Sequence, residues 1–350
     1  MRPLKISILI FLATIAAASA AESEGNVAPL FASNDLVEVT ITAPLEEIMS
    51  VRSLEDEMPG TFAYRDAETG EDVSLDIGIR ARGKFRRDKK TCQFAPLRLN
   101  FSKTKGTLLA KSNKLKLVTH CRNKSERYEQ AVLKEFIAYR ILNTLTDQSF
   151  RVRLLHVNYV ESTTGESLAT TYAFLIEHKN QLAKRIGMEV DESESTLASN
   201  LDGAHTNLVS VYQYLIGNTD FSPIKGVPGE ACCHNYVLMK SGATQISVPY
   251  DFDVSGIVAP PHAKPNPRFG LASVRQRLYR GRCMNNDYLE STFQLFEDRK
   301  ADIYGLVSGQ QDLSDSEQKK TKKFIDSFYK IINSSGQTNR RIIKACLGGS

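Results

Sequence analysis

Alternation of apolar and polar residues runs through the first half of the chain and predicts β-strands. In "DIGIRARG", Ile77, Ile79 and Ala81 alternate with glycine and arginine, so one face of the segment is apolar and the other carries guanidinium groups. The same period of two, with β-branched and aromatic residues, occurs in further segments. We therefore expect strands at "LVEVTIT", "LRLNF" and "KLKLV" and over Arg151–Val160 and Thr170–His178.

A helical period replaces this alternation elsewhere in the chain. The first predicted helix covers Ser125–Leu145, with Ser125 as its cap. The second covers His205–Ile216 and stops at Gly217. The last third of the chain, about Asn286–Cys346, has a mostly helical pattern as well.

A polar, acidic and Ser-rich segment, about Lys179–Asn200, separates the β-rich part from the helical part and predicts a linker. This order of elements predicts an α+β fold. The predicted organisation is a signal peptide at 1–20, a flexible leader at 21–35, a β-rich N-terminal lobe at 36–180, a junction at 181–204 and a catalytic C-terminal lobe at 205–350.

The N-terminus has the layout of a cleaved secretory signal. Arg2 and Lys5 precede the apolar run Ile6–Ala18, and small residues follow, with Ala20 or Ala21 as the last residue removed. A membrane anchor would need about 20 apolar residues, and this run is shorter. We therefore expect a secreted or periplasmic protein with no transmembrane anchor after signal cleavage.

The charge of the chain is nearly balanced, which argues against nucleic acid as a partner. Removing Met1–Ala20 takes away two basic residues and lowers the net charge from +5 to +3. A nucleic-acid-binding protein would instead carry a strongly basic face.

Six cysteines, an even number, fit an oxidising compartment. We predict one bridge in the N-terminal half, Cys92–Cys121. Because a bridge between sequence neighbours is strained, we expect each of the adjacent pair to reach elsewhere. The predicted partners of Cys232 and Cys233 are Cys283 and Cys346. The alternative, a zinc site, lacks any C-x-x-C pair.

Two hydrophobic segments end in carboxylates. "YLIGNTDFS" leads to Asp220, and "VPYDFDVSG" carries Asp251 and Asp253. Between them, "YVLM" and "QISV" flank a turn at Gly242 and predict a β-hairpin. Pairing about this turn brings Asn235 and Asp251 to the same open end of the hairpin.

Such oxygen ligands suit Mg²⁺ or Mn²⁺ bound to nucleotide phosphates. Asp220 would enter the same neighbourhood from the end of a helix. The alternative interpretation is turn chemistry, because Asp and Asn also cap helices and form tight turns.

At these residues the chain resembles the spore-coat CotH family of atypical secreted kinases, over roughly Leu36–Cys283. "GNTD" matches the family's Asn-x-Asp catalytic loop, "HNYVLM" its Asn-Tyr-hydrophobic strand and "VPYDFD" its Pro-Trp-Asp-Leu-Asp segment. Upstream, "IRARGKFRR" and "YAFLIEHKNQLAKR" are also similar to family segments. The resemblance implies a two-lobed protein-kinase-like fold, with a β-rich N-lobe containing one main helix and a mostly helical C-lobe with a β-hairpin at the site.

The resemblance also implies the role of each site residue. Asp220 would orient or deprotonate the acceptor hydroxyl, Asn235 and Asp251 would hold the metal ions, and Asp253 would support them. The gap of 15 residues between Asp220 and Asn235 is longer than is usual in the superfamily. A bridge at the adjacent cysteines would staple this insertion and keep Asn235 at the metal; without one, Asn218 is the fallback.

Phosphoryl transfer also needs cations around the phosphates. "NKLKLVTHC" puts Lys114 and Lys116 on one face of a strand. Glu135, on the following helix, has apolar neighbours and so needs a cation to meet it. Lys116 is the preferred partner of Glu135, with Lys114 as the second choice. The alternative is an ordinary surface pair, since lysines on edge strands also protect against aggregation.

Three further residues are expected near the nucleotide. Arg80 and Arg82 would cover its phosphates, although the chain has no G-x-G-x-x-G loop. Glu177 would lie near the adenine at the lobe junction. The arginines between 268 and 282 either attract an acidic acceptor or, as we favour, form an exposed basic helix face.

We therefore expect an exported, metal-dependent CotH-like protein kinase that uses ATP and Mg²⁺ or Mn²⁺ to modify Ser or Thr hydroxyls of an envelope or secreted protein. Transfer of the nucleotide (AMPylation) from the same site is one alternative. A catalytically degenerate kinase-fold scaffold is another, favoured by the scarcity of ATP outside the cell. No G-x-S-x-G segment occurs, which argues against a serine hydrolase.

Overall fold

The computed structural model describes residues 27–348. The predicted signal peptide and the first part of the predicted leader lie outside these residues. In the part described, no helix is long and apolar enough to cross a membrane.

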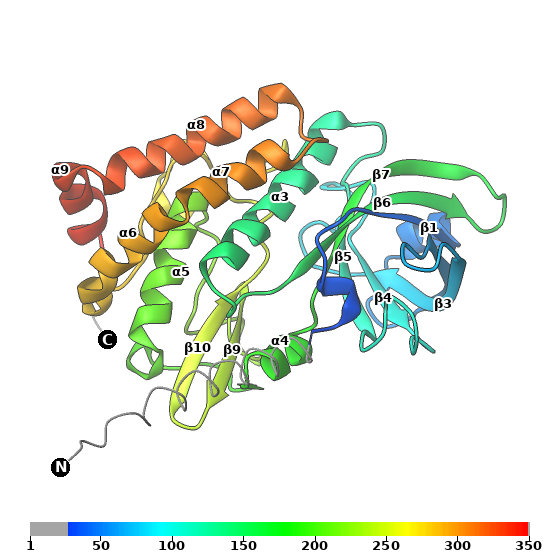
Figure 1. Ribbon diagram of the computed structural model, residues 1–350, viewed down its shortest axis with the longest axis horizontal. Helices are drawn as coiled ribbons and strands as arrows, with labels where there is room; N and C mark the ends of the chain where they lie inside the picture. Colours follow the sequence, from blue (N-terminus) through cyan, green and yellow to red (C-terminus); the bar gives the residue numbers. More distant parts are fainter. Residues whose placement is uncertain (1–26, 349–350) are drawn as a thin grey trace, which may run out of the picture.

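Seven strands close into a β-barrel, on the right of Figure 1. Neighbouring strands pair antiparallel, except that β1 and β6 run parallel, with Val39 opposite Val157, and close the barrel. Its interior is filled by apolar side chains that are fully buried, such as Phe62, Ile79 and Leu117. In order around the barrel, the strands are β1 (Val37–Ala43), β2 (Met58–Arg65), β3 (Asp72–Ala81), β4 (Leu97–Phe101), β5 (Lys114–Val118), β7 (Ser167–Ile176) and β6 (Val152–Glu161).

The closed barrel shows that the predicted two-lobed protein-kinase-like fold is wrong. The strand pattern missed β2, because Pro59 and Gly60 look like a turn. Gly60 serves packing instead, since a Cβ there would lie 2.7 Å from the carbonyl oxygen of Thr42 on β1. The pairing that closes the barrel joins segments more than a hundred residues apart, as at Val39 and Val157, so no local pattern could indicate it.

The rest of the chain forms a largely helical part around α3 (Glu126–Leu145). α3 contacts β6 and β7 of the barrel on one side and α7 on the other, so it lies between the two parts (Figure 1). Its side chains belong to a core shared with the other helices, including Ile141, Val211 and Phe328. The longer helices of this part are α5 (Gly203–Ile216), α6 (Leu289–Asp298), α7 (Lys300–Gly309) and α8 (Asp315–Ile332).

A small sheet packs beneath these helices. Its strand order is β10 (Thr244–Pro249), β9 (Tyr236–Ser241) and β8 (Glu189–Val190). The predicted hairpin is present, with Val237 opposite Val248. The remaining short helices are α2 (Leu45–Val51), α4 (Lys179–Arg185) and α9 (Ser335–Thr338), and a π-helical turn follows at Asn339–Ile343.

Two segments expected to lack structure are ordered elements. The predicted linker begins with α4, which His178 and Gln181 cap reciprocally, and continues into β8. The predicted flexible leader contributes Leu30 and Phe31 to the barrel core. The polar sequence hides the buried side of α4, which consists of Leu182, Ala183 and Arg185.

Three disulfides link the six cysteines. Cys92–Cys121 confirms the first predicted bridge. The other predicted pairings are wrong, because Cys232 bonds to its neighbour Cys233. Cys283 bonds to Cys346 instead. Main-chain hydrogen bonds hold the segments around Cys283 and Cys346 side by side. For example, the Cys283 amide donates to the Leu347 carbonyl. The disulfides fit a protein that folds in an oxidising compartment.

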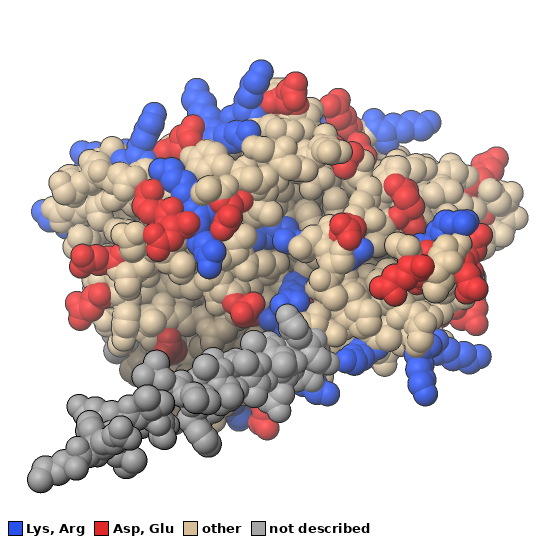
Figure 2. Space-filling view, viewed as in Figure 1, with Lys and Arg blue, Asp and Glu red and all other residues tan. Residues whose placement is uncertain are grey.

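Charged side chains of both signs are scattered over the face of the molecule in Figure 2. On the face shown in Figure 2, acidic and basic groups are interspersed rather than gathered by sign. This mixture agrees with the modest formal net charge of +5 for the whole chain.

Candidate active site

Asp220 lies in a loop that is fixed from both sides. α5 ends at Gly217, whose φ of 67° is left-handed and favours glycine. The side chain of the buried Asn218 then accepts a hydrogen bond from the Asp220 amide at 3.0 Å. Arg280 donates to the carbonyl oxygens of Thr219 and Phe221, at 2.8 and 2.6 Å. The residues on either side of Asp220 are therefore held by one guanidinium group.

Two residues that precede β9 contact the Asp220 carboxylate. His234 Nε2 lies 2.9 Å from Oδ1 of Asp220. The side-chain amide of Asn235 donates to the main-chain oxygen of Asp220 at 2.7 Å and to Oδ2 at 3.2 Å. The hydrogen bond from His234 is the main cause that lowers the pKa of Asp220, and the same contact raises the pKa of His234. Asp220 therefore stays ionised at neutral pH.

The open end of the hairpin carries unusual backbone geometry. Asn235 and Asp251 both have positive φ, 57° and 63°, a region that few residues other than glycine adopt. The Tyr250 amide donates to the Asn235 carbonyl, which ties the two ends together. The Asp251 amide donates a hydrogen bond to the Tyr139 hydroxyl at 2.8 Å. Such strain at two neighbouring polar residues is typical of functional sites.

A cluster of carboxylates surrounds Asp251. Glu135, from α3, is buried, and burial followed by repulsion from Asp253 and Asp251 raises its pKa well above the usual range. Burial and then the Asp251 charge raise the pKa of Asp253 to about 7. Arg86 and Arg82 act in the opposite direction on both groups. Burial and mutual repulsion therefore favour the protonated forms of Glu135 and Asp253, and a bound cation would favour their ionised forms.

Lys116 faces the same cluster from the barrel. Its ammonium lies 4.1 Å from the centre of the Tyr250 ring. Burial and the neighbouring Arg82 lower the pKa of Lys116 to about 8, and the Asp251 charge opposes this shift. Removal from water, rather than a partner carboxylate, therefore dominates its behaviour.

A cavity of about 340 Å³ opens beside Lys116, between the barrel and the small sheet. Its lining contains charges of both signs, and Phe150, Ile176 and Val237 provide an apolar surface. The disulfide-bonded Cys232 and Cys233 also line it. Its acidic residues are Glu177, Asp191, Glu192 and Glu230. The basic side chains of the cavity are Arg98, Lys114, Lys116 and Lys179, with His178 beside them.

The residues singled out in the sequence divide into two groups. Asp220 and Asn235 are in direct contact. Asp251, Asp253 and Glu135 interact electrostatically with one another, and Asp253 also with Asp220. These five side chains therefore converge on one region, and the bridge at the adjacent cysteines is compatible with the position of Asn235.

The predicted ion pair between Lys116 and Glu135 is not formed in the structure. The positive charges that act on Glu135 are those of Arg86 and Arg82. Lys116 instead lies over the Tyr250 ring and interacts with the Asp251 charge. Lys114 is exposed at the rim of the cavity.

Two other residues predicted to bind the nucleotide, Arg80 and Glu177, have side chains that are paired with other residues. Arg80 lies 3.8 Å from Glu57 on the outer side of the barrel. The Glu177 carboxylate is buried in a two-pronged pair with Arg185, at 3.0 and 2.9 Å, although the residue borders the cavity. Glu177 therefore fixes the connection after β7 rather than presenting a carboxylate to the cavity.

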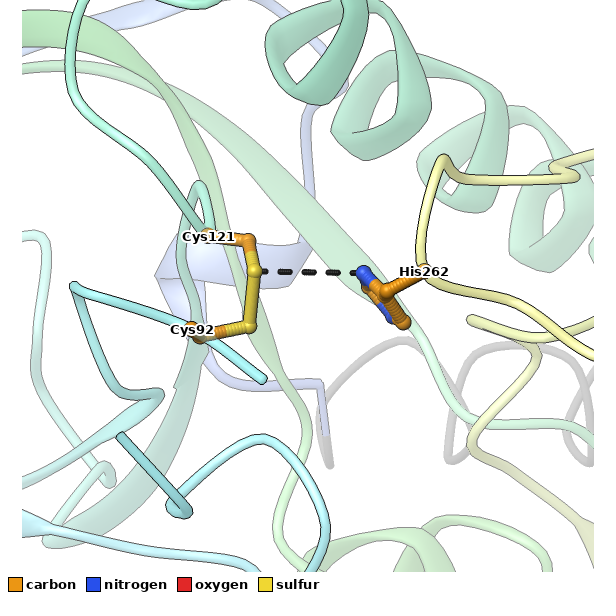
Figure 3. A group of neighbouring side chains, drawn as sticks. All are labelled: Cys92, Cys121 and His262. Atoms are coloured by element: carbon orange, nitrogen blue, oxygen red, sulfur yellow. Dashed lines mark hydrogen bonds between the residues drawn. A yellow bond between two sulfur atoms is a disulfide. The ribbon is translucent and has the colours of Figure 1, made fainter. Parts of the chain in front are cut away.

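Cys92, Cys121 and His262 form the one group of three candidate metal-binding side chains with atoms within 4.8 Å of one another in the described chain. Figure 3 shows that the two sulfur atoms are bonded to each other. Because thiolates, not disulfides, bind metals, this group is no metal centre. The carboxylates around Asp251 are more widely spaced than this.

Sequence reasoning missed three residues that shape the site: Arg98, His234 and Tyr250. Arg98 alternates with buried leucines in "LRLNF" and faces Lys116 across the β4–β5 pair, so the strand pattern could have found it. His234 immediately precedes Asn235 and could have been included with it. Arg280 is one of the arginines between 268 and 282 that the sequence singled out, but its guanidinium group bonds to main-chain carbonyls about sixty positions away rather than lying on an exposed helix face.

No protein-family model matches the chain, and a search of curated proteins finds no similar one.

Proposed function

We propose that this protein is an exported, metal-dependent phosphotransferase that uses ATP to modify Ser or Thr hydroxyls of a protein acceptor. The convergence of Asp220, Asn235 and Asp251 near the cavity that Lys116 and Tyr250 line carries this proposal. The proposal keeps the chemistry that the CotH-like motifs imply and does not depend on the two-lobed fold.

The cavity beside Lys116 suits a nucleotide in size and lining. Its volume of about 340 Å³ is at the lower end of the range for small-molecule sites. The apolar wall at Ile176 and Val237 would hold the base. Lys116 and Arg98 would attract the phosphates, and Lys116 interacts with the Asp251 charge. Lys179 is paired with Glu192 at 2.6 Å.

The carboxylate cluster suits a divalent cation. Asp251, Asp253 and Glu135 offer hard oxygen ligands, and their mutual repulsion makes a cation favourable there. Because Asn235 uses its side-chain NH₂ group on Asp220, its amide oxygen is left for a metal. Mg²⁺ or Mn²⁺ bound here would offset the charge of the phosphate oxygens.

The reaction places each proton and bond as follows. The acceptor hydroxyl oxygen forms a bond to the γ-phosphorus while the bond from that phosphorus to the bridging oxygen breaks, and ADP leaves with the electron pair. The hydroxyl proton passes to the Asp220 carboxylate. Because His234 lowers the pKa of Asp220, this carboxylate acts mainly by orienting the hydroxyl and accepts the proton late, as expected for a loose transition state.

The test is incubation of the purified protein with γ-labelled ATP and Mn²⁺ or Mg²⁺, with phosphate release and self-labelling as readouts. Wild type should release or transfer label only with metal, and Asp251→Asn should reduce the rate at least about a hundredfold. Asp287→Asn, which removes an exposed carboxylate, is the matched control. Absence of metal-dependent γ-phosphate release or transfer by folded wild type would refute the proposal. Retention of an α-label on the protein, without γ-label, would indicate nucleotidyl transfer instead.

A further inference from the structure

A second and larger groove includes Asp220 in its lining. Its volume is about 900 Å³, against about 340 Å³ for the cavity beside Lys116, and the two have no lining residue in common. Thr219 and Asp220 line it from the loop after α5, and Phe85, Lys90 and Thr91 line it from the barrel. A group lying in this groove would therefore reach Asp220 without occupying the nucleotide cavity.

The charges of the groove are almost all positive. Lys90, Arg122, Arg127 and Lys264 line it, and Asp220 is its single acidic residue. All four cations are exposed, and none forms an ion pair with another described residue. Their charge is therefore available to a ligand. This distinguishes them from Arg277 and Arg280, whose guanidinium groups are bonded to main-chain carbonyls.

An aromatic stack holds one wall of the groove in place. His262 stacks on Tyr128 with ring centres 5.6 Å apart and rings inclined by 13°, and it also lies beside Phe85. Its Nδ1 is 3.8 Å from Cys121 Sγ, and Figure 3 shows the ring directed at the disulfide. This contact joins the segment of Pro261, Pro265 and Pro267 to the barrel. Arg122 lies over the other partner in the stack, 5.9 Å from the centre of the Tyr128 ring.

From this arrangement we infer that the groove binds an extended, acidic segment of the acceptor protein, with the modified Ser or Thr at Asp220 and acidic residues on the four cations. The inference rests on the proposed function for the role of Asp220, but the binding itself does not require catalysis. Proline residues along one wall offer no amide donors, so side-chain charge supplies the recognition. Acidic residues flanking the acceptor hydroxyl match both the sign and the spread of these cations.

Fluorescence anisotropy with labelled twelve-residue peptides tests the inference. Each peptide has a central Ser flanked by Glu, by Gln or by Lys. Wild type should bind the Glu peptide at least about tenfold more tightly than the Gln peptide near 0.1 M salt, with the preference falling as salt rises. Arg122→Glu/Arg127→Glu should abolish the preference. Lys330→Glu/Lys344→Glu, an equal charge change at exposed positions near the far end of α8, should keep it.

The outcomes separate this inference from the proposed function. Binding of the Glu peptide without any label transfer would support the groove and contradict the phosphotransferase. Label transfer to Glu and Gln peptides at equal rates would contradict the groove alone. Equal binding of all three peptides, an unchanged preference in the Arg122→Glu/Arg127→Glu variant, or equally strong competition by a DNA oligonucleotide would overturn the inference. If the double variant does not fold, Lys264→Glu, which reverses the charge of another cation of the groove, should weaken the preference for the Glu peptide.

Discussion

The side-chain amide of Asn235 donates to both the main-chain and a side-chain oxygen of Asp220, which lies 15 positions earlier in the chain. His234 holds the other carboxylate oxygen. Two consecutive residues, His234 and Asn235, thus form hydrogen bonds to the carboxylate of Asp220, and both lower its pKa. The long Pro/Gly insertion therefore does not separate the two ends of the site.

The hydrogen bonds from His234 and Asn235 predict how Asp220 titrates. His234→Gln should raise the pKa of Asp220, because the hydrogen bond from His234 is the largest cause of its lowering, and Asn235→Ala should raise it by less. NMR titration of the Asp220 carboxyl carbon would measure both changes. The acid limb of any transfer activity should move to higher pH in the same order. An unchanged Asp220 titration in His234→Gln would show that the contact is unimportant in solution.

The carboxylate cluster predicts competition between metal and protons. Because the folded protein raises the pKa of Asp253 to about 7 and also raises that of Glu135, these groups carry protons at mildly acid pH that a metal must displace. The affinity for Mn²⁺ should therefore increase with pH below about 7, by about tenfold per unit for each proton displaced. Calorimetry between pH 5.5 and 8 tests this, and Asp253→Asn should flatten the dependence. An affinity independent of pH in wild type would contradict the assignment of these ligands.

The lowered pKa of Lys116 predicts that the affinity for the nucleotide changes with pH in the opposite direction. Its pKa of about 8 means that the ammonium is present at pH 7 and is lost as the pH rises. A bound phosphate favours the charged form, so the affinity for ATP should fall gradually above pH 8. Lys116→Arg should retain affinity at pH 9, and Lys116→Met should bind weakly throughout. Lys114→Met, on the same strand but exposed, should have a smaller effect. Identical profiles for wild type and Lys116→Met would exclude Lys116 from the nucleotide site.

The pair formed by Glu177 and Arg185 predicts a structural effect. Both side chains are 3% exposed, so removing one leaves the other charged and buried. Glu177→Ala should lower the free energy of unfolding by about 3–5 kcal/mol. Glu192→Ala, which breaks a pair with Lys179 that is largely exposed, should cost about 1 kcal/mol or less. Urea unfolding would measure both, and equal costs would contradict this account of the junction.

Local signals predicted the elements of the structure better than their assembly. "LRLNF" and "KLKLV" are strands with the predicted boundaries, and Gly217 ends α5 as expected, because alternation and C-capping act over a few residues. Closure of the barrel depends on the pairing of β1 with β6, which no local pattern encodes.

The candidate site shows the same division. The hairpin about Gly242 could be predicted, and it brings Asn235 and Asp251 to one end. The partners of Glu135 could not, because Arg82 and Arg86 approach it from the end of β3 and the loop after it rather than from the predicted lysine strand. The prediction excluded a bridge between the neighbours Cys232 and Cys233. It could not foresee that Cys283 and Cys346 bond to each other, which leaves Cys232 and Cys233 no other partner among the six cysteines.

The central claim is that oxygen-bearing side chains from distant segments hold one divalent cation against a nucleotide. Thermal unfolding with a non-hydrolysable ATP analogue, with and without Mn²⁺, tests it most directly. The account predicts a rise in Tm of several degrees when both are present, lost in Asp251→Asn and kept in Asp287→Asn. An unchanged Tm of wild type at millimolar analogue, with Mn²⁺ and with Mg²⁺, would contradict it.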